Sequence, residues 1–138
     1  MRQQTHPSDM TLIDPVPGYQ AGACNIGPDE ITMRRRVGHI GVVITIALLV
    51  FLVAIGAAPA WRLLIALPAA GTVITYLQAI NRFCVNFGWR GVFNFDRVGT
   101  VQTVTDAAAR RADRDRALRM ILTGCVIGLA IGIVAAIA

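Results

Sequence analysis

Three long apolar stretches, separated by polar segments, dominate the chain. They cover residues 37–58, 62–80 and 117–138. At a rise of about 1.5 Å per residue, a helix of about 20 residues crosses a hydrocarbon core of about 30 Å. The chain is 55% hydrophobic and only 15% charged, which is too apolar for a soluble domain of 138 residues. The pattern therefore predicts an all-α integral membrane protein with three transmembrane helices.

The polar segment before the first apolar stretch divides into a tail and a helix start. Residues 1–23 contain three prolines and show no helical or strand period, which predicts an extended tail that orders only against a partner. Gly27 and Pro28 then suit the cap and the first position of a helix, and two acidic residues follow them. We expect residues 24–80 to form a membrane hairpin whose first helix begins near Pro28.

The polar segment between the second and third apolar stretches should form a loop and an amphipathic helix. This segment, residues 81–116, carries Thr103 and Asp106 at the spacing of a capping box. We therefore expect a helix to begin at Thr103, in water, and to continue through residues 117–138 as the third crossing.

The distribution of arginine predicts how the helices are oriented. Three arginines directly precede the first apolar stretch, eight lie between residues 82 and 119, and only Arg62 lies in the turn between the first two stretches. The positive-inside rule places both arginine-rich regions in the cytoplasm, with the N-terminus inside and the C-terminus outside. All thirteen cationic side chains are arginine, a usage typical of GC-rich bacterial genomes, so the expected location is a bacterial inner (plasma) membrane. Cations beside apolar segments predict contact with anionic lipid headgroups and not with nucleic acid.

Aromatic residues interleaved with polar ones follow the second apolar stretch. This loop is a candidate docking surface for a partner or a lipid, because aromatic residues and arginine are enriched at binding hot spots. A plain interfacial anchor explains the same pattern, and both interpretations remain open. The candidate docking residues are Phe83, Phe87, Trp89, Arg90, Phe93 and Phe95.

Two of the three cysteines flank the predicted hairpin on its cytoplasmic side. An antiparallel hairpin would bring Cys24 and Cys84 close to one another, with His39 one turn into the first crossing. Together they are candidates for a thiol or metal site. Their spacing matches no metal motif, and a free cysteine is more often a small buried apolar residue. We predict no resident cofactor.

Three glycines four residues apart lie in the third apolar stretch. Gly124, Gly128 and Gly132 fall on one helix face, where the absence of side chains lets another backbone approach closely. The sequence leaves three partners open for this face: the chain's own hairpin, a second copy in a homo-oligomer, or a different membrane subunit.

A short set of residues resembles a known family. Asn25, Ile26 and Gly27, then Arg36 and Gly38, then Phe83, Cys84, Phe87 and Gly88 resemble the small two-helix membrane domain that occurs alone or fused to rhodanese modules. The resemblance covers about residues 25–88, and it implies membrane anchoring more than a defined catalytic act. The chain lacks the proline that commonly follows the family's cysteine, and it adds a basic loop and a third crossing.

The sequence predicts binding surfaces but contains no recognisable reaction centre. It has no phosphate loop, serine elbow or HExxH motif, and no acidic or basic residue lies deep within an apolar stretch. We therefore expect a non-enzymatic accessory or scaffolding subunit of a membrane complex, with no catalytic residues. The alternative is a thiol-dependent sulfur, redox or metal-handling protein, and a homo-oligomeric pore is a weaker third hypothesis.

Overall fold

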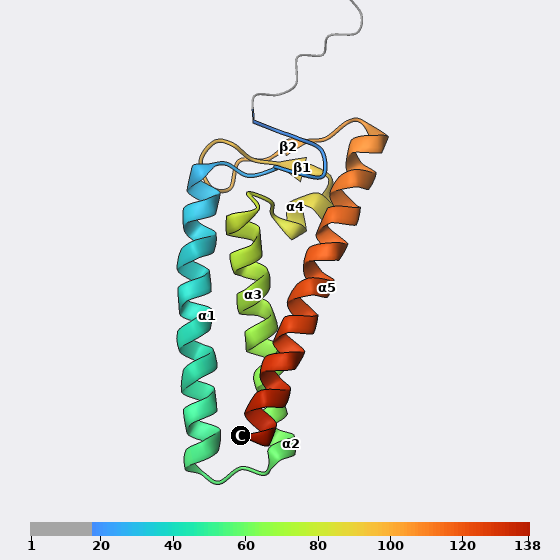
Figure 1. Cartoon of the computed structure of the whole chain (residues 1–138). Coiled ribbons are helices and arrows are strands. Elements are labelled where there is room, and N and C mark those ends of the chain that lie inside the picture. The colour runs from blue at the N-terminus through green and yellow to red at the C-terminus, as the bar shows by residue number, and fades with distance from the viewer. Residues whose placement is uncertain (1–17) are drawn as a thin grey trace, which may run out of the picture.

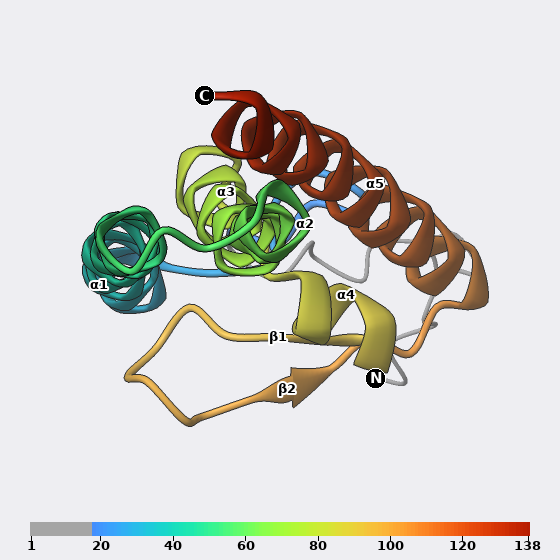
Figure 2. The same ribbon diagram turned by 90° about the horizontal axis from the view of Figure 1, so that it is seen from below.

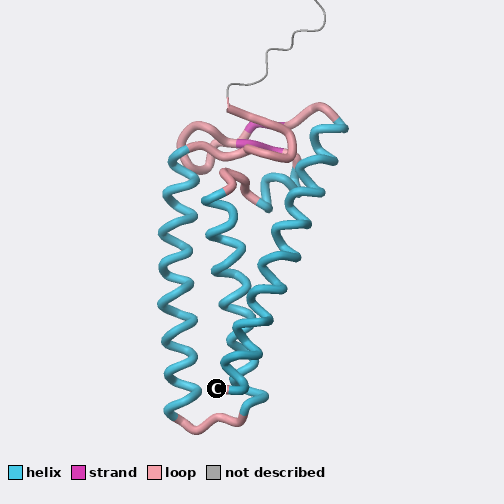
Figure 3. The backbone as a smooth tube through the Cα atoms, in the orientation of Figure 1, coloured by secondary structure: helices cyan, strands magenta, loops and turns pink. Residues whose placement is uncertain are grey.

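The computed structural model describes residues 18–138 and is mostly helical. Three helical segments are long and apolar enough to cross a membrane: Pro28–Ala54, Pro59–Ile80 and Ala107–Ile137. They run side by side, with the turn after the first helix and the C-terminus at one end and all the strands and long loops at the other (Figures 1 and 3). The predicted number and approximate positions of the membrane helices are confirmed.

Helix α1 spans Pro28–Ala54 and begins where the sequence predicts. Gly27 is its N-cap, Pro28 takes the first position, and Asp29 and Glu30 lie in the first turn. The helix ends four residues before the expected boundary at residue 58, because Gly56 adopts a positive φ of 66° that a right-handed helix cannot contain.

The second membrane segment is built from three consecutive pieces. The short helix α2 (Pro59–Arg62) leads into a 3-10 turn (Leu63–Ile65) and then into α3 (Ala66–Ile80). Pro68 has no N–H to offer the carbonyl of Leu64, so the preceding turn tightens into 3-10 geometry.

The third membrane helix, α5, spans Ala107–Ile137 and begins later than predicted. Asp106 is its N-cap, and its Oδ2 accepts a hydrogen bond of 2.8 Å from the amide of Ala109. The expected start at Thr103 is wrong because that residue lies in strand β2 (Gln102–Thr103), which pairs antiparallel with β1 (Val92–Phe93). The chain is therefore not purely helical.

Helix α3 lies between α1 and α5 and packs against both of them (Figure 2). The three glycines of α5 are buried against it. A Cβ built on Gly128 would lie 2.5 Å from the Cα of Ala70, and one on Gly132 would lie 2.7 Å from the Cβ of Ala66. Gly124 faces Ile74 in the same way. Of the three partners that the sequence leaves open for the glycine face, the structure places the chain's own α3 against it.

The polar end of the molecule is a folded cap, which we define as residues 18–27 and 81–106. It contains the short helix α4 (Val85–Arg90), the two strands and the chain segment that leads into α1. Ile26 forms a parallel bridge with Asn94, so the segment before α1 is joined to the loop after α3. The loop between the second and third crossings is thus a compact layer across one end of the three helices (Figure 1).

Candidate functional site: the polar cap

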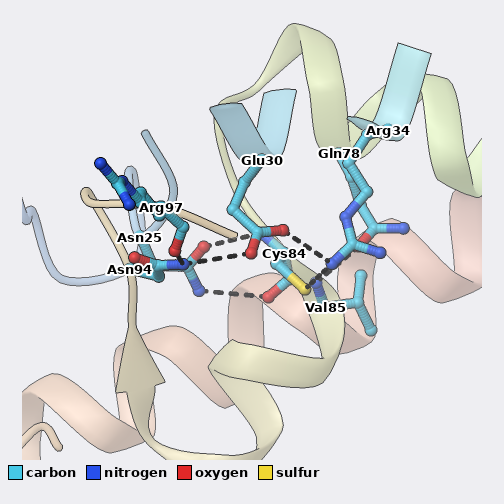
Figure 4. Close-up of polar contacts among 8 residues, drawn as sticks. All are labelled: Asn25, Glu30, Arg34, Gln78, Cys84, Val85, Asn94 and Arg97. Atoms are coloured by element: carbon cyan, nitrogen blue, oxygen red, sulfur yellow. Dashed lines mark hydrogen bonds and ion pairs between the residues drawn. The ribbon is translucent and has the colours of Figure 1, made fainter. Parts of the chain in front are cut away.

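Asn25 joins the two ends of the membrane hairpin. Its side-chain amide donates to the carbonyl of Cys84 at 3.1 Å, and its Oδ1 accepts from the amide of Cys84 at 2.6 Å (Figure 4). The side chain is fully buried, and both its donor and acceptor are used. An asparagine with this geometry replaces a strand partner, so it fixes the segment that leads into α1 against Cys84, the residue before α4.

Asn94 forms the second buried amide centre of the cap. Its Nδ2 donates to Glu30 Oε1 at 3.1 Å and to the carbonyl of Arg97 at 2.9 Å (Figure 4). Its Oδ1 accepts from the amide of Asp96. Its backbone carbonyl accepts from the amide of Gly27 at 2.8 Å. A Cβ on Gly27 would lie 2.9 Å from the backbone of Phe95, so this close approach requires glycine.

Cys84 lies beside a partly buried ion pair. The Arg34 guanidinium donates to its Sγ at 3.1 Å and lies 3.6 Å from Glu30 Oε2 (Figure 4). Burial raises the pKa of the Cys84 thiol above its usual value, although the amide of Phe87 and the charge of Arg34 both favour the thiolate. The thiol is fully buried. The environment therefore favours a neutral, inaccessible thiol.

The end of the predicted tail is anchored on α5. Tyr19 donates its hydroxyl proton to Asp113 Oδ2 at 2.8 Å, and the amide of Gly22 donates to Asp113 Oδ1 at 2.7 Å. Burial and the hydrogen bond to the Asp113 carboxylate raise the pKa of Tyr19. The expectation of an extended tail is therefore wrong for residues 18–23, whereas residues 1–17 lie outside the described residues.

The predicted thiol or metal set does not assemble. Within residues 18–138, no group of three or more His, Cys, Asp or Glu side chains is placed to hold a metal ion. Cys24 is half-buried, and its Sγ donates to the carbonyl of Ile26 at 3.9 Å. His39 is exposed on α1 and its Nδ1 lies 2.6 Å from the hydroxyl of Tyr76. Each of the three residues thus has its own surroundings.

The predicted docking residues divide into two groups. Phe83, Phe87 and Phe93 are buried in the cap and under it, so their assignment to an exposed docking surface is wrong. The cap needs these rings because its loops supply few other large apolar side chains for a core. Phe95 is half-buried, and Trp89 and Arg90 remain exposed.

Trp89 and three arginines are exposed where α4 meets α5. We call Trp89, Arg90, Arg110 and Arg114 the Trp89 surface. Arg114 Nε donates to the carbonyl of Trp89 at 3.4 Å, near the negative end of α4. Arg110 lies against Gly91, which ends α4 with a φ of 70°. The Trp89 side chain is 56% exposed and held on a helix that packs against α5.

The sequence interpretation missed the buried polar residues that organise the cap. Glu30, Asn94 and Asp113 are almost fully buried, and Gln78 Oε1 accepts from the amide of Val85 at 3.1 Å (Figure 4). The role of Gln78 could have been predicted from the sequence, because an amide side chain near the end of an apolar stretch needs a hydrogen-bond partner. The role of Asp113 could not, because it is one of several charged residues in an arginine-rich helix.

Searches with the whole sequence and structure match no family model, no curated protein and no solved structure. The resemblance to the two-helix membrane domain therefore stays a prediction. Three of the residues that carry it, Asn25, Gly27 and Cys84, meet in the cap, where each has a structural role.

Proposed function

We propose that this chain is a non-catalytic accessory or scaffolding subunit of a membrane protein complex. Its docking site is the Trp89 surface, and its partner is another membrane subunit with an acidic face at the same depth. The single observation that supports this is the pairing of an exposed tryptophan with three arginines on a rigid support. Tryptophan and arginine provide large contact area and charge-directed hydrogen bonds, which is why they are enriched at interface hot spots.

The proposal includes an orientation in the bacterial inner membrane. The cap and the N-terminus face the cytoplasm, and the turn between α1 and α2 and the C-terminus face outward. The arrangement of the arginines supports this, since eleven of the thirteen belong to the cap, to the cap-side halves of α1 and α5 or to the loops joining them, and Arg62 lies at the other end. Single cysteines introduced in the Gly56 turn and at Thr100 test the orientation. The measurement is the labelling of each cysteine from each side of sealed vesicles.

Copurification tests the docking surface. The tagged chain is extracted from its own membrane in mild detergent, and its native mass and composition are measured. We expect a stoichiometric complex with a larger membrane assembly, and we expect Trp89→Ala with Arg90→Glu to dissociate it. The matched control, Trp61→Ala with Arg97→Glu, removes the same residue types away from the surface and should leave the complex intact. A lone chain or a homo-oligomer, or equal behaviour of the two variants, would overturn the proposal.

One contact supports a second candidate, a thiol-dependent sulfur, redox or metal-handling role centred on Cys84. The guanidinium of Arg34 is placed to stabilise a thiolate at Sγ. Burial of the sulfur acts against this role, because a working thiol must be reachable. Maleimide labelling of the folded Cys125→Ser variant separates the two functions. The scaffolding proposal expects Cys24 to label while Cys84 does not, whereas rapid labelling of Cys84 would favour thiol chemistry.

A further inference from the structure

An apolar groove lies in the membrane part of the molecule, between α1 and α3. Its lining residues come from three helices. They are Val42, Thr45 and Ile46 of α1, Ala69, Thr72, Val73 and Tyr76 of α3, and Ile131 of α5. The groove opens to the lipid phase, because Ile46 is 56% exposed. Its lining is almost entirely apolar, so it suits a hydrocarbon chain.

The cap end of this groove carries positive charge. A second hollow lies where the cap meets the two helices. Its lining includes Ile31 and Arg35 of α1, Ile80 and Arg82 at the end of α3, and cap residues such as Cys24 and Phe95, and none of its described lining residues is acidic. Arg35 precedes the first apolar stretch by two residues, and Arg82 follows α3 by two residues. Both arginines therefore lie at the boundary where lipid phosphates are found.

The two hollows belong to one line along the helices. On α1, residues 35, 39, 42 and 46 are spaced by four, three and four, so they share one face. On α3, residues 80, 76, 73 and 69 have the same spacing in reverse. Between the arginines and the apolar groove, His39 Nδ1 lies 2.6 Å from the hydroxyl of Tyr76. From the cap end towards the middle of the helices, the groove therefore presents the two arginines, then the polar pair of His39 and Tyr76, and then apolar side chains.

The backbone at Arg82 adopts a conformation that favours glycine, so the fold does not explain an arginine at this position. Arg82 follows the C-cap of α3 and has a φ of 52°, the one positive φ at a non-glycine position among the described residues. Glycine is the usual residue at this position of a helix end. The fold uses only the carbonyl of Arg82, which accepts from the amides of Asn25 and Ile26.

We propose that this groove binds an anionic phospholipid from the surrounding bilayer. The phosphate lies between Arg35 and Arg82, the His39–Tyr76 pair faces the glycerol ester region, and one acyl chain follows Val42, Val73, Ile46 and Ala69. An anionic lipid is favoured over a zwitterionic one because the mouth offers two cations and no described acidic side chain for an ammonium group. The proposal does not depend on the Trp89 surface.

Native mass spectrometry of the full chain in mild detergent, with equal amounts of phosphatidylglycerol and phosphatidylcholine, tests the site. We expect one retained phosphatidylglycerol. Arg82→Gly should weaken its retention about fivefold, the factor that corresponds to one interfacial arginine. This variant removes the charge while suiting the backbone, so the fold should persist. Arg97→Gly, which removes an exposed arginine outside the groove, is the matched control and should retain the lipid.

A second pair of variants tests the apolar half. Val73→Phe fills the groove and should displace the lipid, whereas Gly71→Phe adds a larger group where nothing lies within 4 Å and should not. Equal retention by the wild type, Arg82→Gly and Val73→Phe would overturn the proposal. A second copy of the chain bound in place of lipid, or equal retention of the two lipids, would also contradict it. If Arg82→Gly loses the bound phosphatidylglycerol and Val73→Phe keeps it, the placement of the acyl chain would be overturned.

Discussion

The cap and the membrane bundle hold distant parts of the chain together by opposite means. The contacts that join the segments of the cap are hydrogen bonds of buried polar groups, centred on Asn25 and Asn94, and Asp113 of α5 anchors the start of the cap in the same way. Between α3 and α5, the contacts along the glycine face are close approaches of three glycines to apolar residues of α3.

The solvent explains the difference between the two regions. In lipid, burying apolar surface yields little, because the acyl chains are as apolar as leucine, so helices gain energy from close packing. The cap lies in or near water, where the hydrophobic effect drives Phe83, Phe87 and Phe93 inward. Its short segments leave many backbone groups without secondary-structure partners, and buried amide side chains satisfy them.

The most damaging change should be a side chain added at the centre of the glycine face. In Gly128→Val, the new Cβ alone would come within 2.5 Å of Ala70, so α5 must move away from α3. We expect a loss of about 3 kcal/mol in the free energy of unfolding. The measurement is reversible unfolding in mixed micelles of sodium dodecyl sulfate and a mild detergent.

Gly71→Val is the control for this change, because it adds the same side chain to a membrane helix where nothing lies within 4 Å. It should leave the free energy of unfolding almost unchanged. Similar losses for the two variants would mean that helix propensity, and not contact between α3 and α5, determines the effect.

Removal of a buried amide should damage the cap and spare the bundle. Asn25→Ala leaves the amide and carbonyl of Cys84 buried without their partners, which should cost about 2 kcal/mol. Hydrogen exchange followed by peptide mass analysis should show faster exchange at residues 82–95 and unchanged exchange in α3 and α5. Asn86→Ala, at an exposed asparagine of α4, is the control. Equal acceleration throughout the chain would show that the cap and the bundle open as one unit.

The smallest loss of stability should come from a change where the cap joins the membrane bundle. Asp106→Ala removes the N-cap of α5, which should cost about 1 kcal/mol and speed exchange in the first turn of that helix. Thr103→Ala, at the exposed position that the capping-box pattern favoured, should change neither quantity. A larger effect at Thr103 than at Asp106 would contradict the start of α5 at Ala107.

The glycine face shows how far the sequence could lead. Its spacing predicted a close helix contact, because four-residue repeats of glycine have few other uses in a membrane helix. The partner of the glycine face depends on which segment the fold places beside α5, and the spacing of the glycines does not contain this information. The aromatic loop shows the opposite outcome. Its composition suggested exposed rings, yet three of them are buried in or under a cap whose existence the pattern did not indicate.

The sequence by itself determined the three segments that are long and apolar enough to cross a membrane, and the start of α1, because hydropathy over about 20 residues and local capping chemistry are properties of short segments. Only the tertiary structure decided that Asn25 reaches Cys84, that Asp113 anchors Tyr19, and that Arg35 and Arg82 share one groove. These pairs lie between 47 and 94 residues apart. Their meeting depends on how α1, α3 and α5 pack, which no local pattern encodes.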